Sequence, residues 1–387
     1  MACGPARRCP RCSAWWTKSD AAEPIFVRKI GANFRGKFGA RTVSGRTYLD
    51  WNATAPLRPE AKAAMVAAME VVGNPSSVHA EGRASKALME RARAQVAAAL
   101  GADGADIVFT SGATEAAALA LAGRGIACAG VEHDAVAAWC DVALAVDAAG
   151  RVAVADPAAS ALQLANPETG VIQNLPEGLA LSDLTQAFGK IPVAFNWLGA
   201  DMAIVSAHKL GGPKGVGALV LRRGLDVAAR LKGGGQEMGR RAGTENLIGI
   251  AGFGAAAEAA QRDLADGVWE RVSGIRNILE SALALAESQT IIVGKGGARL
   301  PNTSCLITPG WKGETQVMQM DLAGFAVSAG SACSSGKVRP SRVLRAMGFD
   351  EIAAASALRV SIGPDTTEDD VLRFAEAWTK AARRRRA

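Results

Sequence analysis

At positions 206–215 the chain reads Ser-Ala-His-Lys-Leu-Gly-Gly-Pro-Lys-Gly, and an apolar run stands on each side of this stretch. Met202–Val205 before it and Val216–Leu221 after it have the length and composition of short buried strands. A lysine placed where a buried strand gives way to glycines is partly withdrawn from water. Its pKa falls, and the free amine becomes available for chemistry.

Residues suited to a phosphate flank this lysine. Ser206 and His208 can donate hydrogen bonds, and Gly211, Gly212 and Gly215 let the backbone approach a bound group closely. A free lysine amine forms Schiff bases with carbonyl compounds, of which pyridoxal phosphate (PLP) is the best known. A single lysine at a strand end is more often a solvated surface residue, so this interpretation depends on the rest of the chain.

The composition indicates a globular protein with a sizeable core. The chain has 387 residues, enough for a large domain and a smaller one, and 49% of them are hydrophobic. It contains no apolar run of about 18 residues, which predicts no membrane span. It also lacks a charged-then-apolar start of the secretory type. Seven cysteines without a paired pattern then favour a reducing, cytoplasmic location.

The formal net charge of +7 is concentrated at the two ends of the chain. Residues 1–47 hold ten basic and two acidic residues, whereas residues 48–387 hold 34 and 35, of which Arg383–Arg386 are terminal. We expect the nearly neutral body not to bind nucleic acid. The basic leader, residues 1–43, is expected to be disordered or without function. Its Cys3, Cys9 and Cys12 are one ligand short of a structural zinc site, so no intrinsic metal is predicted.

Strand and helix patterns alternate along the rest of the chain, which is typical of a mostly parallel sheet covered by helices. The patterns predict helices at 59–72, 84–100, 269–287 and 341–347, and strands at 107–110, 126–129, 142–146, 152–155, 161–165, 202–205, 216–221 and 358–362.

Two connections are too short for a crossover helix. Only eight residues, 170–177, separate the turn at 166–169 from the apolar residues 179–181. An average helix has about 11 residues, and a crossover needs at least about 12. The connection from 152–155 to 161–165 is equally short. We therefore expect no helix in either place and a thinly covered sheet face.

A second phosphate-binding pattern follows the strand at 107–110. Ser-Gly-Ala-Thr-Glu at 111–115 joins this strand to an Ala/Leu-rich helix. A helix N-terminus after a turn of small residues offers free N–H groups and the positive end of the helix dipole. Taken alone this pattern is a weak signal for an anion site, because many α/β turns share it.

From residue 48 to about 378 these motifs resemble those of the NifS/IscS-type cysteine desulfurases, which are class V aminotransferase-like PLP enzymes of fold type I. The resemblance implies an α/β fold. Its large PLP-binding domain, at 44–265, would contain a mostly parallel, seven-stranded-type sheet. A smaller C-terminal α/β domain, at 266–387, would carry the catalytic cysteine loop, and the arm at 44–60 would contribute to it.

By this resemblance, three residues carry the chemistry. Lys209 resembles the Schiff-base lysine, which also moves the proton at the α-carbon of the substrate. His133, in Glu-His-Asp-Ala-Val at 132–136, resembles the histidine that stacks on the cofactor ring and assists proton transfer. Cys333, in the Ser/Ala/Gly-rich stretch 328–336, resembles the nucleophile that takes up the substrate's sulfur as a persulfide, with a transient iron–sulfur handoff.

The same resemblance assigns the cofactor contacts. Asp183 and Gln186 resemble the partners of the pyridine nitrogen and the ring oxygen. Thr244, which ends a glycine-rich loop, resembles the residue that reaches the phosphate in the partner subunit, so a homodimer is implied. The expected phosphate ligands within the subunit are Ala113, Thr114, Ser206 and His208.

Arg359 resembles the bidentate anchor for the substrate carboxylate. One turn departs from the family pattern Asn-Asn-Glu-x-Gly, because it reads Asn166-Pro167-Glu168-Thr169-Gly170. Proline cannot donate a hydrogen bond. Either Asn166 takes over the contact with cofactor and substrate, or the site is weaker.

The resemblance implies that L-cysteine is converted to L-alanine with a persulfide on Cys333. The sulfur would pass to an acceptor such as an iron–sulfur scaffold or a tRNA-thiolation protein. Two alternatives stay open: another class V PLP enzyme, such as a transaminase or selenocysteine lyase, and a PLP-binding homologue without turnover.

Overall fold

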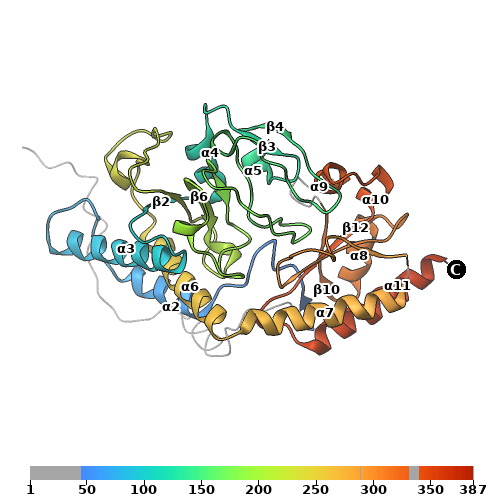
Figure 1. Ribbon diagram of the computed structural model, residues 1–387. Coiled ribbons are helices and arrows are strands. Elements are labelled where there is room, and N and C mark those ends of the chain that lie inside the picture. The colour runs from blue at the N-terminus through green and yellow to red at the C-terminus, as the bar shows by residue number, and fades with distance from the viewer. Residues whose placement is uncertain (1–44, 288, 331–339, 387) are drawn as a thin grey trace, which may run out of the picture. The chain divides into compact units, whose positions relative to one another are not determined.

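A computed structural model of the chain describes residues 45–287, 289–330 and 340–386, all within one compact unit (Figure 1). The leader predicted at 1–43 and the nucleophile predicted at Cys333 lie outside the described residues. The boundary between a large and a small domain at 265/266 stays a prediction. Among the helices that the structure describes, none is long and apolar enough to cross a membrane.

The larger sheet has four strands in its regular part, and one of them runs against the others. Its order is β2 (Asp106–Thr110), β7 (Gly217–Leu221), β6 (Met202–Ser206) and β5 (Ser182–Asp183). β7 is antiparallel to both of its neighbours, whereas β5 is parallel to β6.

Three further segments continue this sheet beyond β5. Ala161 forms a parallel bridge to Leu181, and its N–H donates to the carbonyl of Ala127 (2.8 Å). β3 (Ala127–Ala129) then pairs in parallel with β4 (Asp141–Leu144). The result is the mostly parallel, seven-stranded type of sheet that the resemblance predicted, with β7 as the antiparallel member.

Both faces of the sheet are buried at β6 and β7, which explains why these two central strands are almost continuously apolar. Ala203 and Val205 of β6 pack into the core on one face, and Ile204 packs into the core on the other. The helices are α2 (Pro59–Met69), α3 (Ala80–Ala99) and α6 (Leu247–Ala265) over the first face, and α4 (Ala113–Leu121) with α5 (Asp134–Ala137) over the second.

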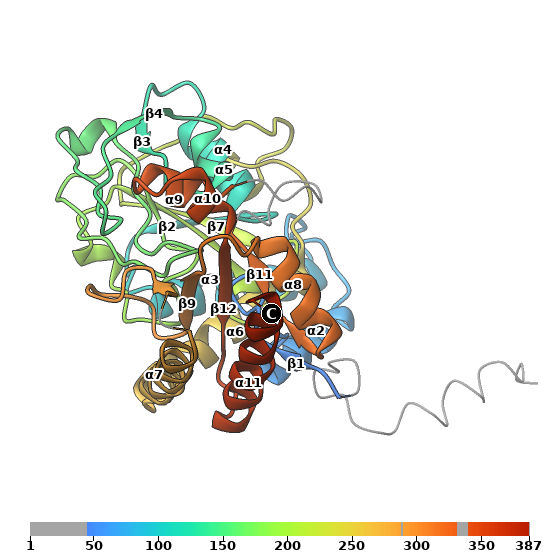
Figure 2. The same cartoon turned by 90° about the vertical axis from the view of Figure 1, so that its right-hand side faces the viewer.

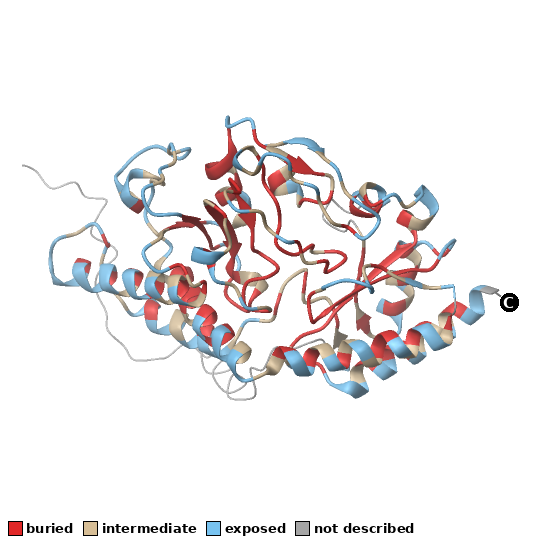
Figure 3. Cartoon of the chain, in the orientation of Figure 1, coloured by how far each residue is buried: buried red, intermediate tan, exposed pale blue. Residues whose placement is uncertain are grey.

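The segment between β4 and β5 contains no crossover helix, as the short connections predicted. Within it the structure has only a 3₁₀ turn at Pro157–Ala159. Residues 160–165 are nevertheless buried, and so are most residues of 179–190. Ala161 and β5 belong to the sheet itself, and irregular chain, not helices, joins the sheet segments here (Figure 3).

The C-terminal part of the chain has an antiparallel sheet of its own. Its order is β11 (Ser328–Ala329), β12 (Ala357–Ser361), β9 (Thr303–Ile307) and β8 (Ile291–Ile292). Figure 2 shows α7 and α11 side by side below this sheet. The remaining helices are α7 (Val268–Ala286), α8 (Gly313–Leu322), α9 (Arg342–Ala346), α10 (Glu351–Ala355) and α11 (Glu368–Arg386).

The N-terminal arm connects this C-terminal part to the larger sheet. β1 (Thr47–Tyr48) pairs in parallel with β10 (Phe325–Ala326), and Leu49 is buried in the core under α7 and α11. Farther along the arm, the N–H of Ala55 donates to the carbonyl of His208 (2.9 Å). The arm thus brings residues 50–55 between the two sheets.

A buried ion pair closes the β2 edge of the larger sheet. Arg93 of α3 donates to both carboxylate oxygens of Glu237 (2.8 and 2.9 Å), and the N–H of Phe109 donates to the same carboxylate (2.9 Å). Glu237 and Met238 have φ angles of 48° and 58°, which residues with a Cβ rarely adopt. The ion pair therefore holds a strained turn in the glycine-rich loop against the sheet.

We expect Glu237→Ala to lower the free energy of unfolding by about 3 kcal/mol, because it removes the buried carboxylate that accepts from both the half-buried guanidinium of Arg93 and the N–H of Phe109. Glu90→Ala is the matched control, since it removes an exposed partner of the same arginine (3.1 Å) and should cost less than about 1 kcal/mol. Urea unfolding measures both values. Equal losses in the two variants would contradict a structural role for the buried pair.

Candidate active site

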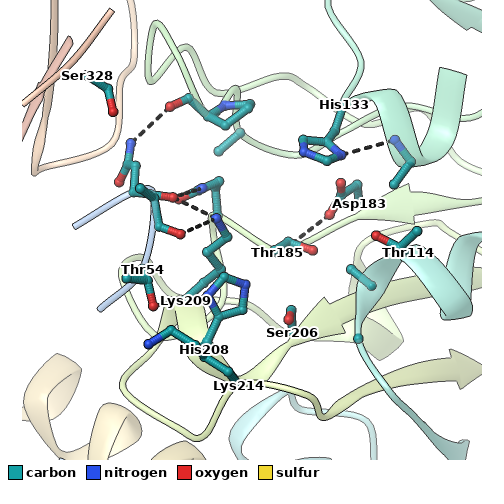
Figure 4. A pocket seen from close by; sticks show the side chains of 18 of the residues that line it. Thr54, Thr114, His133, Asp183, Thr185, Ser206, His208, Lys209, Lys214 and Ser328 are labelled. Atoms are coloured by element: carbon teal, nitrogen blue, oxygen red, sulfur yellow. Dashed lines mark hydrogen bonds between the residues drawn. The ribbon is translucent and has the colours of Figure 1, made fainter. Parts of the chain in front are cut away.

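A cavity of about 630 Å³ lies where the arm, the larger sheet and β12 meet (Figure 4). Cofactor and ligand sites are typically about 300–1,000 Å³, so the cavity has a suitable size. Asp183 ends β5 and Ser206 ends β6, which puts the cavity at the carboxyl ends of parallel strands. The predicted site residues that line it are Ala113, Thr114, His133, Asp183, Gln186, Ser206, His208, Lys209 and Arg359.

Lys209 ends a short 3₁₀ turn that directly follows β6. Its amine donates to the backbone carbonyls of Asn52 (2.8 Å) and Ala53 (2.9 Å), so the arm holds it at the cavity (Figure 4). Gly211 allows the chain to turn back, because it has a φ of 87° and an added Cβ would lie 2.5 Å from the Cγ of Arg58.

His208 is uncharged near neutral pH. Its burial, together with the positive charges of Lys209, Lys214 and Lys190, lowers its pKa to about 4. Its Nδ1 lies 3.2 Å from the hydroxyl of Thr54. A neutral imidazole at this place can still donate one hydrogen bond to an anion.

Asp183 and His133 lie on one side of the cavity, with Lys209 on the other (Figure 4). The N–H of Thr185 donates to Oδ1 of Asp183 (2.8 Å). His133 caps α5, and its Nδ1 accepts from the N–H of Ala135 (3.1 Å). A neutral His133 ring therefore carries its proton on Nε2.

The N-terminus of α4 provides an anion site at the cavity. No side chain caps this helix, and its first residues, Ala113 and Thr114, line the cavity. An added Cβ at Gly217 would lie 2.5 Å from the carbonyl of Val205 and 2.7 Å from the Cα of Gly112. Only glycine therefore lets the turn before α4 pack this closely on the sheet, where its free N–H groups can hold a phosphate.

This set of groups fits PLP. An amine is available for the aldehyde, a carboxylate faces it from the far side for the ring nitrogen, and an uncapped helix N-terminus is available for the phosphate. The residues that would hold PLP are Lys209, Asp183, Gln186, Ala113, Thr114, Ser206 and His208.

Arg359 comes from β12 and is buried at the cavity wall. Nη2 donates to Asp50 (2.8 Å) and Nη1 to the carbonyl of Pro167 (3.1 Å). Nε is buried without an acceptor in the described structure. Since an unpaired buried donor is costly, Nε is a free position for a ligand carboxylate.

The structure does not place Asn166 among the residues that line the cavity. Its Oδ1 accepts from the backbone N–H groups of Glu168 (2.9 Å) and Thr169 (2.8 Å), and its Nδ2 donates to the carbonyl of Val131 (3.0 Å). The turn itself uses the amide of Asn166, and its contact with cofactor and substrate stays a prediction. Pro167 faces the cavity instead.

Two other predicted residues are not among the described residues that line this cavity. Thr244 is exposed and does not line it. Cys333 lies outside the described residues, although Ser328 and Gly330, in the segment leading to it, do line the cavity. Their roles stay predictions.

Several buried polar residues near the cavity were missed by sequence reasoning. Burial raises the pKa of Glu132 well above its usual range, and burial also raises that of Glu168. An added Cβ at Gly330 would lie 2.6 Å from Oε1 of Glu168, so glycine is required there. Asn52 and Lys190 are buried beside Gln186. Lys190, four residues after Gln186 in an otherwise apolar stretch, could have been found from the sequence.

Comparisons with known proteins agree with this geometry. Residues 47–374 match the aminotransferase class-V family. A cysteine desulfurase from Cereibacter sphaeroides is 40% identical over 369 residues, which cover 86% of this chain and 94% of that protein.

Solved structures are similar over most of the chain. An X-ray structure of a NifS-like protein from Rickettsia africae ESF-5 has a TM-score of 0.79 at 32% identity, covering 87% of this chain and 99% of that one. The structure of SspA in complex with cysteine has a TM-score of 0.68 at 26% identity, covering 83% and 99%.

Proposed function

The chain belongs to the aminotransferase class-V family, and from this premise we propose that it is a PLP-dependent cysteine desulfurase. The observation that carries the proposal is the meeting of Lys209, Asp183 and His133 around one cavity that also contains an uncapped helix N-terminus. The relatives named cysteine desulfurase and the NifS-like fold support the same conclusion. The neighbour solved in complex with cysteine supports L-cysteine as the substrate.

The cofactor would be held covalently by the amine of Lys209. The carboxylate of Asp183 would pair with its ring nitrogen, and Gln186 would donate to its ring oxygen. When bound, PLP supplies an electron sink for the α-carbon of the substrate. The ring of His133 would stack on it and, since Nδ1 accepts from the N–H of Ala135, donate from Nε2.

Arg359 and Lys209 carry out substrate binding and the first proton transfer. Arg359 binds the carboxylate of L-cysteine, for which its Nε is available. The amine of Lys209 takes the proton from the α-carbon.

The thiolate of Cys333 attacks the sulfur of the substrate, so that an S–S bond forms and the C–S bond breaks. The electron pair of the broken bond stays on the β-carbon of the substrate, which takes up a proton, and Lys209 returns a proton to the α-carbon. L-cysteine and the Cys333 thiol thus become L-alanine and a Cys333 persulfide.

The proposal extends to partners and location. The persulfide sulfur passes to an iron–sulfur scaffold or a tRNA-thiolation protein in the cytoplasm, where thiols stay reduced. Thr244 is exposed away from its own cavity, which supports contact with the phosphate site of a second copy in a homodimer. A light-scattering mass equal to one chain would contradict the homodimer.

We expect the purified full-length chain, supplied with PLP, L-cysteine and dithiothreitol, to release L-alanine and sulfide in equal amounts. Amino-acid analysis and a sulfide assay measure the two products. A chain that lacks residues 1–43 should behave in the same way. A yellow protein that forms no alanine would contradict the proposal and favour a homologue without turnover.

A further inference from the structure

A buried lysine lies behind Gln186, outside the set of residues that line the cavity. Lys190 is only 2% exposed. Its Nζ donates to Oε1 of Gln186 (2.6 Å) and to Oδ1 of Asn52 (3.0 Å). Both acceptors are neutral amide oxygens. Burial, followed by the charges of Lys209 and Arg359, lowers the pKa of Lys190 well below its usual range.

These two hydrogen bonds determine which way both amides point. An amide has a carbonyl oxygen on one side and an NH₂ group on the other, and Nζ donates to the oxygen. The NH₂ groups must therefore point away from Lys190. Nε2 of Gln186 donates to the carbonyl of Asn52 (2.9 Å), and Nδ2 of Asn52 donates to Thr303 (2.8 Å) and to the carbonyl of Pro167 (3.1 Å).

Asn52 links Lys190 to Lys209 through hydrogen bonds. It is 1% exposed, and its backbone carbonyl accepts from both Gln186 and the amine of Lys209 (2.8 Å). Its Oδ1 accepts from Lys190 and from Nδ2 of Asn302 (3.0 Å). The buried amine of Lys190 thus supports Gln186 directly and Lys209 through Asn52.

We propose that Lys190 is a positioning residue, which keeps the NH₂ group of Gln186 directed away from itself and fixes the arm carbonyl that holds Lys209. This rests on the proposed function, since Gln186 is the expected donor to the cofactor's ring oxygen. Without Lys190, the oxygen of Gln186 loses its donor. The amide is then free to rotate and to present its oxygen, which repels another oxygen, to the cofactor.

The first test is the affinity of the cofactor-free protein for PLP. Lys190→Met keeps the length of the side chain and removes the donor. We expect it to weaken PLP binding about tenfold, the effect of losing one well-formed hydrogen bond. The absorption maximum of the bound cofactor should also shift. Lys86→Met, an exposed substitution on α3, is the control and should leave both readouts unchanged.

A double-mutant cycle separates positioning from a merely structural role. If Lys190 acts mainly through Gln186, then Lys190→Met should change PLP affinity less than about twofold when Gln186→Ala is already present, and this remainder is the effect through Asn52. The same tenfold loss in both backgrounds would overturn the proposal.

Lys190→Gln covers the case in which the methionine variant fails to fold. It retains an N–H donor, so we expect affinity within about threefold of the original chain and an unshifted absorption maximum. Affinity as weak as that of Gln186→Ala would overturn the proposal. Alanine formation by the unmodified chain tests the proposed function separately. If the unmodified chain forms alanine but the effects of Lys190→Met and Gln186→Ala on PLP affinity are additive, only the role of Lys190 is rejected. If the two effects are not additive but no alanine forms, only the desulfurase activity is rejected.

Discussion

Cys333→Ala is expected to reduce alanine formation from L-cysteine by at least roughly a thousandfold, while the absorption of the bound cofactor stays unchanged. Removal of a catalytic nucleophile typically costs this much or more, because the attack on the substrate's sulfur then lacks the group proposed to make it. The proposed cofactor contacts come from other residues, so binding and chemistry should separate in this variant. Alanine is measured under multiple turnover with dithiothreitol.

The control for this prediction is Cys140→Ala, which removes a half-buried free thiol from the described part of the chain and should leave the rate within about twofold. After a single turnover without reductant, mass spectrometry should find one additional sulfur atom on the peptide that contains Cys333. Alanine or sulfide formation that survives Cys333→Ala would contradict the persulfide mechanism. It would favour a selenocysteine lyase or another class V enzyme.

Lys209→Ala is expected to abolish covalent attachment of the cofactor and to lower the rate of alanine formation by roughly ten-thousandfold. In the proposed mechanism one amine both holds the cofactor and moves the α-proton, so its loss would remove two functions at once. Borohydride reduction followed by peptide mass spectrometry measures the attachment site. The unmodified chain should carry the cofactor on the peptide that contains Lys209.

Lys214→Ala is the matched variant for this experiment, because Lys214 also lines the cavity. We expect it to keep the covalent bond, since the arm carbonyls of Asn52 and Ala53 hold Lys209 and not Lys214 in place. A borohydride-stable adduct that persists in Lys209→Ala would show that another lysine, such as Lys190, forms the bond.

Much of the fold and part of the site could be predicted because the signals are local. The strands predicted at 202–205 and 216–221 are β6 (Met202–Ser206) and β7 (Gly217–Leu221). Burial on both faces makes such strands continuously apolar, and glycines mark the turn between them. Lys209 and Asp183 directly follow or end strands, so their approach to one cavity at the carboxyl ends of parallel strands could be expected from the sequence.

The orientation of the polar side chains depends instead on partners that lie far away in the chain. Asn52 bonds with Asn302, which is 250 residues distant, and with Lys190, 138 residues distant. A pattern of neighbouring residues in the sequence does not predict hydrogen bonds between residues so far apart. Asn166 had the right residue type for a ligand contact, but the backbone N–H groups of its own turn already occupy its oxygen.

The sequence by itself predicted the buried strands on either side of Lys209, because burial leaves a local apolar pattern, and the resemblance of the Lys209 motif to class V PLP enzymes implied the cofactor. Only the tertiary structure decided which groups hold that lysine and Gln186, and that Pro167, not Asn166, faces the cavity. The physical reason is that a hydrogen-bonding group can satisfy only a limited number of partners. Which partners it meets is decided when distant segments pack together and exclude water.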